Sequence, residues 1–203
     1  MEEKDLIAAA RGGDRGAFDQ LVRSYQGLVY NAAYRILGDV DAASDATQEA
    51  FLSAFKAMGR FRGGSFKGWL LRIATNACYD QLRRQKRQPA SSLEALYLDP
   101  GSRPMEGERE GPEEYALRRE LGRVIQRGLA ALPLDQRVAL VFSDVEGLSY
   151  QEIAEATGTN VGTVKSRLSR GRARLRDYLL AQEELLPPRY RLKVEGPKEE
   201  GHV

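Results

Sequence analysis

Residues 149–176 read SYQEIAEATGTNVGTVKSRLSRGRARLR, and this stretch predicts two short helices joined by a tight turn. Ser149, followed three residues later by Glu152, has the form of a capping box, which begins a helix. Gly158 lies where that helix must end, because glycine adopts the left-handed conformation without a Cβ penalty. Asn160 is a suitable N-cap for the next helix. The spacing therefore predicts a helix-turn-helix.

The second helix of this pair divides into faces when its residues are placed about 100° apart. The face that must pack on a core consists of Val161, Val164, Leu168 and Leu175. The opposite face is a polar strip between two basic edges. The strip consists of Thr163, Ser166, Ser169 and Arg170, and the edges of Lys165 with Arg172 and Arg167 with Arg174. In the major groove of DNA, a polar strip of this kind contacts the bases, and the basic residues on either side of it contact the phosphates.

A solvated basic face on an ordinary helix bundle is the alternative interpretation of these charges. A run of charge alone would favour that alternative. Here, however, the capping box, the glycine turn and the phased basic edges occur together. We therefore predict that the helix-turn-helix binds duplex DNA.

The composition is that of a globular protein. The chain has 203 residues, of which 42% are hydrophobic and 30% charged, and this length suits one large domain or two small ones. Its net charge is only +2, so the positions of the charges matter more than their sum. No stretch approaches the roughly 18 apolar residues that cross a bilayer, and the acidic N-terminus lacks the apolar block of a secretory signal. We expect a cytoplasmic protein with no membrane insertion.

The sequence argues against most His-based catalytic schemes and against zinc sites. The one histidine is His202, beside the C-terminus, and there is no Walker loop, GxSxG motif, Cys/His pair or metal-ligand cluster. The one cysteine, Cys78, is expected to fill a helix interface. Glu152 and Glu155 are interpreted as helix-surface carboxylates. We therefore expect no catalysis, no cofactor and no metal.

Helical periodicity begins well before the helix-turn-helix. Apolar residues recur three or four apart over residues 18–36, and further helices are predicted over residues 41–58 and 66–87. A Gly63-Gly64-Ser65 break separates the last two. The residues expected to turn inward from the middle helix are Ala46, Ala50, Phe51, Ala54 and Phe55.

A change of composition divides the chain. Residues 88–112 are rich in Pro, Gly, Ser and Glu, which predicts a flexible linker, and residues 183–203 form a polar tail. No segment alternates with the period of a strand. The predicted fold is therefore all-α, with two small helical domains at residues 1–87 and 113–182 joined by the linker.

Residues 61–69, FRGGSFKGW, combine aromatic side chains and positive charge around a glycine turn. This is the chemistry of single-strand recognition, in which bases leave the duplex and stack. The helix that follows ends in Arg83, Arg84, Lys86 and Arg87, which suit backbone phosphates. Phe66 and Trp69, three residues apart, are more often core residues than stacking platforms, and we expect Trp69 to be at least partly buried.

Three motifs, in this order, resemble the extracytoplasmic-function sigma factors of bacterial RNA polymerase, the smallest members of the sigma-70 family. They are DAASDATQEAFLSAF (41–55), FRGGSFKGWLLRIATNACYDQLRRQKR (61–87) and LSYQEIAEATGTNVGTVKSRLSRGRARLRDYL (148–179). The resemblance implies a dissociable subunit that binds core RNA polymerase and directs promoter-specific initiation. It implies a first domain called region 2 and a second called region 4, together with an anti-sigma factor as a regulatory partner.

The resemblance also implies site residues. The helix over residues 39–55 would dock on the clamp helices of the β′ subunit, and region 4 on the β flap. The clamp contacts would be Asp41, Asp45, Gln48 and Glu49, for which a solvated helix face is the alternative. The strand of the minus-ten promoter element would contact Phe61, Arg62, Gly63, Gly64, Ser65, Lys67, Asn76, Asp80, Arg83 and Arg84. The second helix of the helix-turn-helix would read the minus-thirty-five element, with base contacts from Lys165, Ser166, Ser169 and Arg170.

Another class of protein remains open from the residues alone: a stand-alone activator or repressor whose first block senses a ligand. Such a protein needs a ligand pocket or a dimer seam, and neither a heptad run nor a cluster of inward polar residues indicates one. Footprinting would separate the two classes, because a stand-alone regulator protects promoter DNA without the polymerase.

Overall fold

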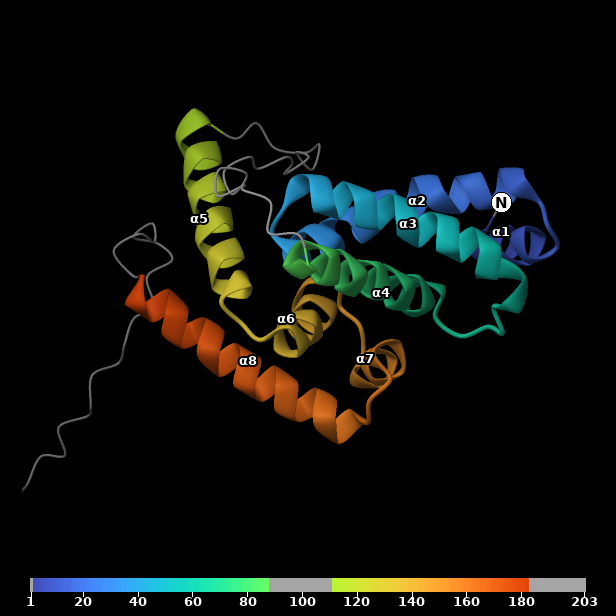
Figure 1. Cartoon of the computed structure of the whole chain (residues 1–203). Helices are drawn as coiled ribbons and strands as arrows, with labels where there is room; N and C mark the ends of the chain where they lie inside the picture. Colours follow the sequence, from blue (N-terminus) through green and yellow to red (C-terminus); the bar gives the residue numbers. More distant parts are fainter. Residues whose placement is uncertain (1, 88–110, 183–203) are drawn as a thin grey trace, which may run out of the picture.

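The computed structural model describes residues 2–87 and 111–182. Every regular element within these two ranges is helical (Figure 1), as the periodicity predicts. Residues 88–110 of the predicted linker and the predicted tail at 183–203 lie outside the described residues. The linker prediction extended to residue 112, whereas a helix already begins at Pro112.

The first unit consists of four helices and a short 3-10 turn. The helices are α1 (Glu3–Arg11), α2 (Arg15–Leu37), α3 (Val40–Ala57) and α4 (Phe66–Arg87), and the turn η1 (Met58–Arg60) follows α3. Asp14 and Asp39 cap α2 and α3, because each side chain accepts a hydrogen bond from a backbone N–H of the first turn. α2 ends at Gly38, whose φ of 76° lies in the left-handed region.

Helix α3 packs through a face of alanines. Ala42, Ala43, Ala46, Ala50 and Ala54 are all buried. Side chains this small let α2 and α4 approach α3 closely from both sides. Phe51 is half-buried, but the inward prediction for Phe55 was wrong, because 45% of Phe55 is exposed. Its ring lies at the rim of the α2–α3 contact, edge-on to Phe18 at a centroid distance of 5.1 Å.

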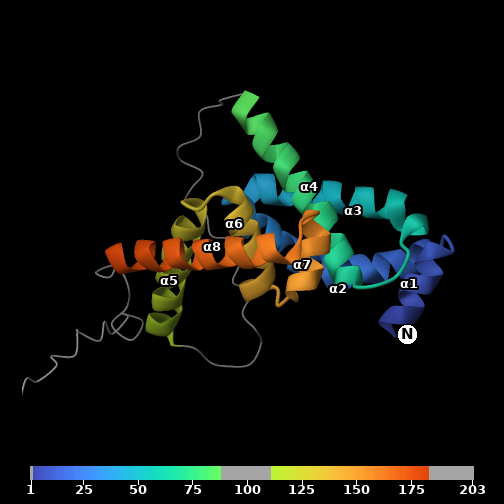
Figure 2. The same cartoon turned by 90° about the horizontal axis from the view of Figure 1, so that it is seen from below.

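The second unit contains the helix-turn-helix. It consists of α5 (Pro112–Ala130), α6 (Leu134–Leu140), the single π-helical turn η3 (Val141–Val145), α7 (Tyr150–Thr157) and α8 (Val161–Ala181). The structure confirms the local predictions. Ser149 and Glu152 form a reciprocal capping box, Gly158 ends α7 with a φ of 65°, and the Asn160 side chain caps α8. Figure 2 shows α8 crossing α6 and lying beside α7.

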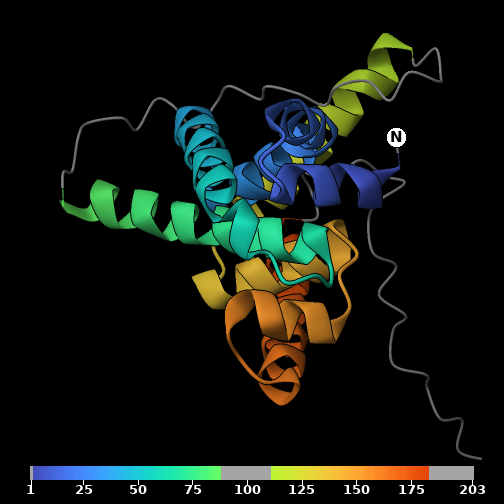
Figure 3. The ribbon, with the colours of Figure 1, turned by 90° about the vertical axis from the view of Figure 1, so that its right-hand side faces the viewer.

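The two units pack against each other, which the sequence did not predict. Helix α4 lies between the other helices of the first unit and α7 (Figure 3). The end of α2 contacts the second unit as well. The Gln126 side chain donates to the carbonyls of Tyr34 and Arg35 at 3.3 Å, and the Arg137 guanidinium donates to the carbonyl of Ile36. The last carbonyls of a helix have no partner within the helix. In α2, side chains of the second unit donate to those of Arg35 and Ile36, and to that of Tyr34, which also accepts from the Gly38 N–H.

The alanine face of α3 predicts that a larger side chain on this face destabilises the fold. Ala50 is fully buried, so Ala50→Leu should lower the free energy of unfolding by about 1–3 kcal/mol, because a closely packed interface must move apart. Urea unfolding monitored by circular dichroism would measure this. Ser53→Leu, at an exposed position of the same helix, is the control and should change stability by less than about 0.5 kcal/mol. Equal effects of the two variants would contradict the close packing of α3.

Candidate nucleic-acid interface

The aromatic residues of the loop between η1 and α4 form a packed cluster. Phe61 and Phe66 are 5% and 4% exposed, and Trp69 is half-buried as expected. The Phe61 ring lies 5.1 Å from the Trp69 ring and 5.7 Å from the Phe66 ring, centroid to centroid. The prediction that Phe61 contacts the DNA strand conflicts with its burial. Its ring anchors the loop to the core, and Trp69 presents the aromatic surface.

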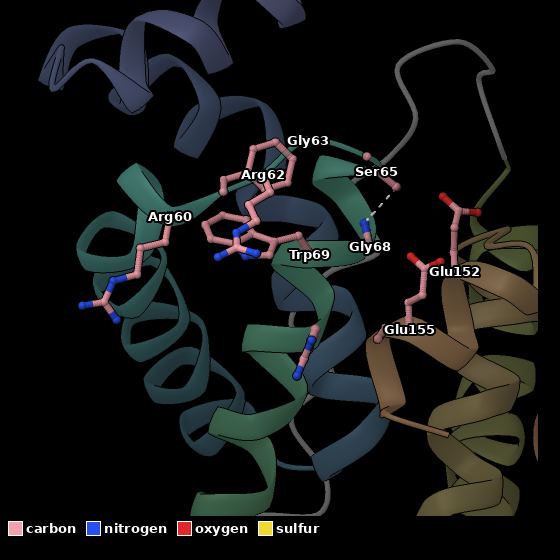
Figure 4. A pocket seen from close by; sticks show the side chains of 12 residues that line it. Arg60, Arg62, Gly63, Ser65, Gly68, Trp69, Glu152 and Glu155 are labelled. Atoms are coloured by element: carbon pink, nitrogen blue, oxygen red, sulfur yellow. Dashed lines mark hydrogen bonds between the residues drawn. The ribbon is translucent and has the colours of Figure 1, made fainter. Parts of the chain in front are cut away.

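An open pocket of about 260 Å³ lies beside this cluster (Figure 4). Gly63 and Gly64 have φ values of 98° and 88°, a conformation that glycine adopts readily. The Ser65 hydroxyl accepts a hydrogen bond from the backbone N–H of Gly68 at 3.1 Å and thereby caps α4. The first-unit residues that line the pocket are Arg60, Phe61, Arg62, Gly63, Gly64, Ser65, Gly68, Trp69 and Arg72.

The motif-based prediction missed two of these lining residues, Arg60 and Arg72. Arg72 lies three residues after Trp69 on α4, so the helical spacing that brings such residues to one face could have revealed it. Arg60 lies in η1, just before the FRGGSFKGW motif of residues 61–69. With Arg62, these residues place three guanidinium groups around a pocket beside an aromatic ring, an arrangement that suits a nucleotide.

The other predicted strand contacts on α4 differ in accessibility. Asn76, Arg83 and Arg84 are exposed and Asp80 is half-buried. Arg83 pairs with Asp80 at 3.0 Å. Lys67 is half-buried and already paired, since its ammonium group donates to the Glu146 backbone carbonyl and lies 3.5 Å from the Glu146 carboxylate.

The faces of α8 follow the helical projection. Val164 and Leu168 are buried, and Val161 and Leu175 pack partly against the same core. On the other side, Lys165, Ser166, Ser169 and Arg170 are exposed and Thr163 is half-buried. The structure therefore presents the predicted polar strip to solvent.

The basic edges of α8 are not the open rows of cations that the sequence indicated. The Arg167 side chain is 22% exposed and pairs with Asp135 at 3.0 Å. Arg172 makes a two-bond contact with Asp144, at 2.6 and 3.1 Å, which lowers the pKa of that carboxyl. Arg174 donates to the Gln136 side chain at 3.2 Å. A projection of α8 alone could not show these acceptors, because they lie on α6 and η3.

The exposed face of α3 carries the predicted clamp contacts. Asp41, Asp45 and Gln48 are exposed, while Glu49 is half-buried and 3.5 Å from Arg84. The predicted set omitted two apolar residues of this face, Leu52 (63% exposed) and Phe55. They line a groove between α2 and α3 together with Phe18, Val22 and Phe51. An apolar groove with a charged rim is typical of a surface that binds another protein.

Comparison with known proteins identifies the family. The sigma-70 region 2 family matches residues 21–88, and the sigma-70 region 4 family matches residues 122–175. The sigma-H factor of Pseudomonas aeruginosa is 37% identical over 84% of this chain and 90% of its own length. The SigE factor of Mycolicibacterium smegmatis is 42% identical over 82% of this chain, which spans 64% of that longer relative. The chain belongs to the extracytoplasmic-function subfamily of the sigma-70 family.

Solved structures agree with the family assignment. The sigma factor RpoE of Bartonella quintana, in complex with the anti-sigma factor NepR, superposes with a TM-score of 0.64 and 26% identity over 80% of this chain and 96% of its own. CnrH, in complex with the cytosolic domain of CnrY, also gives 0.64, with 28% identity over 88% of this chain and 97% of its own. A sigma factor directs core RNA polymerase to promoters and is itself not an enzyme.

The described residues were also searched for membrane-spanning helices and metal-ligand groups. Neither range holds a helix long and apolar enough to span a membrane, or a group of His, Cys, Asp and Glu residues suited to a metal ion. Cys78 is fully buried, and burial raises the pKa of its thiol to about 12.

The burial of Cys78 predicts that its thiol is unreactive in the folded protein. Only the thiolate reacts with alkylating reagents, so native protein at pH 8 should take up almost no iodoacetamide over an hour, whereas protein in 6 M guanidinium should be labelled fully. Intact-mass spectrometry would measure both. Fast labelling of the native protein would contradict the burial of this side chain.

Proposed function

We propose that this sigma factor recognises the two promoter elements through the two surfaces described above. The pocket formed by residues 60–65 and the start of α4 binds a flipped base of the minus-ten strand. The polar strip of α8 reads the minus-thirty-five element in the major groove. The observation that carries this proposal is the coexistence of an exposed helix-turn-helix strip and an arginine-lined aromatic pocket in one chain of this family.

The single-strand surface is chemically distinct from the duplex surface. The pocket offers Trp69 as a stacking face and Arg60, Arg62 and Arg72 as phosphate or base ligands, and it is large enough for one planar group. The exposed Asn76, Arg83 and Arg84 extend this surface along α4. The strip on α8, by contrast, is convex and narrow, which suits a groove.

The protein partners follow from the remaining surfaces. Asp41, Asp45, Gln48 and Glu49, with the apolar groove beside them, are proposed to bind the β′ clamp helices, and the second unit to bind the β flap. An anti-sigma factor is proposed as a regulator, because the Bartonella relative was solved with one. With these partners, the protein is proposed to act in the cytoplasm.

The α8 assignment predicts a separation of DNA reading from polymerase binding. Lys165→Ala and Ser166→Ala should each lower promoter-specific transcription by roughly fivefold to a hundredfold, because each good base contact contributes about 1–3 kcal/mol. The affinity for core polymerase should not change. Transcription in vitro and a pull-down with core polymerase would measure the two properties. Arg11→Ala, which removes an exposed cation at the end of α1, is the charge control. Loss of polymerase binding instead would contradict the assignment.

The arginines on the edges of α8 predict a second effect, on binding to duplex DNA of any sequence. Arg174→Ala should weaken binding of the polymerase complex to any duplex and reduce the slope of log affinity against log salt by about one, because one phosphate contact is lost. The Arg167→Ala effect on the slope should be smaller, since Asp135 already pairs with Arg167. Filter binding between 50 and 200 mM salt would measure both slopes. A slope that Arg174→Ala leaves unchanged would argue against a phosphate contact there.

A further inference from the structure

Arg170 differs from the arginines on the edges of α8 in what holds its side chain. Arg167, Arg172 and Arg174 are bound by acceptors on α6 and η3. The Arg170 side chain is instead bound within α8, since its Nε donates to the Ser166 backbone carbonyl and its Nη2 to the Ser166 hydroxyl, both at 3.2 Å. These two bonds keep the guanidinium group over the polar strip.

The direction of each hydrogen bond at the Ser166 hydroxyl follows from the chemistry of its partner. The Thr163 backbone carbonyl can only accept, so the hydroxyl donates its one proton to this carbonyl at 2.9 Å. A guanidinium group can only donate, so the same hydroxyl accepts from Arg170. Ser166 therefore has no proton left to donate to a base, and its hydroxyl orients Arg170.

These contacts leave one edge of the guanidinium group of Arg170 open. The group is a planar fork with five N–H donors. Ser166 takes the edge formed by Nε and Nη2, so the outer edge, formed by Nη1 and the second N–H of Nη2, points away from Ser166. Both residues are exposed, which leaves this outer edge accessible. Two parallel N–H groups match the O6 and N7 acceptors that guanine presents in the major groove.

The position of the pair along α8 also suits a contact with a base. Ser166 and Arg170 are four residues apart and therefore lie on one face of the helix. Long helical side chains lean toward the N-terminus of their helix, and the Ser166 contacts fix Arg170 in this direction. The N-terminal part of a recognition helix is the part that contacts base edges, and α8 begins at Val161.

We propose that Ser166 is a positioning residue for Arg170, and that Arg170 reads a guanine of the minus-thirty-five element. Arg170 contacts the base, and Ser166 holds the guanidinium group in the orientation that presents its outer edge. A side chain ordered before binding loses less conformational entropy when it contacts the base. The inference rests on the proposed function of α8 as the helix that reads this element, and it assigns the specificity at one base pair to a hydrogen bond within the helix.

Transcription in vitro by core polymerase, from templates with a randomised minus-thirty-five element, tests this inference when the transcripts are sequenced. The wild-type protein should prefer guanine at the position that Arg170 reads by about fivefold to a hundredfold. Arg170→Ala should abolish this preference. Arg170→Lys keeps the charge but should lose most of the preference, because an ammonium group lacks the planar fork.

Ser166→Ala should reduce the guanine preference at that same position by about twofold to tenfold, which is the contribution of one hydrogen bond. The reduction is partial because the bond from Nε to the backbone carbonyl remains. Alanine is a better helix former than serine, so unfolding of α8 does not account for the loss. Ser166→Thr keeps a hydroxyl and should retain the preference. Ser169→Ala, which removes another hydroxyl of the exposed strip, is the matched control and should leave the preference at this position unchanged.

The double variant Ser166→Ala with Arg170→Ala separates positioning from a base contact by Ser166 itself. If Ser166 acts through Arg170, the double variant should have the same base preferences as Arg170→Ala alone. A further loss in the double variant would overturn the inference. So would a Ser166→Ala effect at a different position of the element, or an equal effect at all positions.

Failure of the inference can be distinguished from failure of the proposed function. If Lys165→Ala alters the base preferences and Arg170→Ala does not, or if Arg170 proves to select a base other than guanine, the inference is wrong and α8 still reads the element. If neither Lys165→Ala nor Arg170→Ala alters a preference at any position, the proposed function of α8 is wrong as well.

Discussion

The first unit depends on the small side chains of α3. Five buried alanines on one face allow α2 and α4 to pack closely on α3, and no larger side chain would fit without moving them. This packing leaves the opposite face of α3 free to carry acidic residues, Leu52 and Phe55. The surface proposed to bind the polymerase is thus the face of α3 that this packing leaves exposed.

The contact between the units is of a different physical kind. It combines hydrogen bonds from polar side chains of the second unit to the last carbonyls of α2, the contact of Lys67 with Glu146, and buried apolar residues of both units that belong to one cluster. Water can replace these hydrogen bonds when the units separate, so each contributes only about 0.5–1.5 kcal/mol. Each unit also keeps its own buried helix contacts.

Local signals of the sequence predicted most of the fold. The capping box at Ser149, the glycine at 158 and the Asn160 cap are interactions within a few residues, and all three lie where the spacing indicated. Phe55 was misplaced because helical periodicity cannot distinguish the centre of a buried face from its rim. The partners of Arg167, Arg172 and Lys67 lie 28 to 79 residues away in sequence, so no local pattern could reveal that these predicted DNA contacts are already paired. Phe61 shows the same limit: an aromatic residue beside a glycine turn suits both stacking on a base and anchoring a loop.

The near-neutral charge of the chain is explained in part by carboxylates that lie beside its arginines and lysines. The net charge is +2, although the proposed DNA surfaces are rich in arginine and lysine. Asp135 and Asp144 hold cations of α8, Glu146 holds Lys67, and Glu152 and Glu155 face the arginines of the pocket. At the proposed DNA surfaces, DNA binding would therefore exchange internal carboxylates for phosphates and would not simply add phosphates to free cations. The net gain in electrostatic free energy is correspondingly small for the free chain.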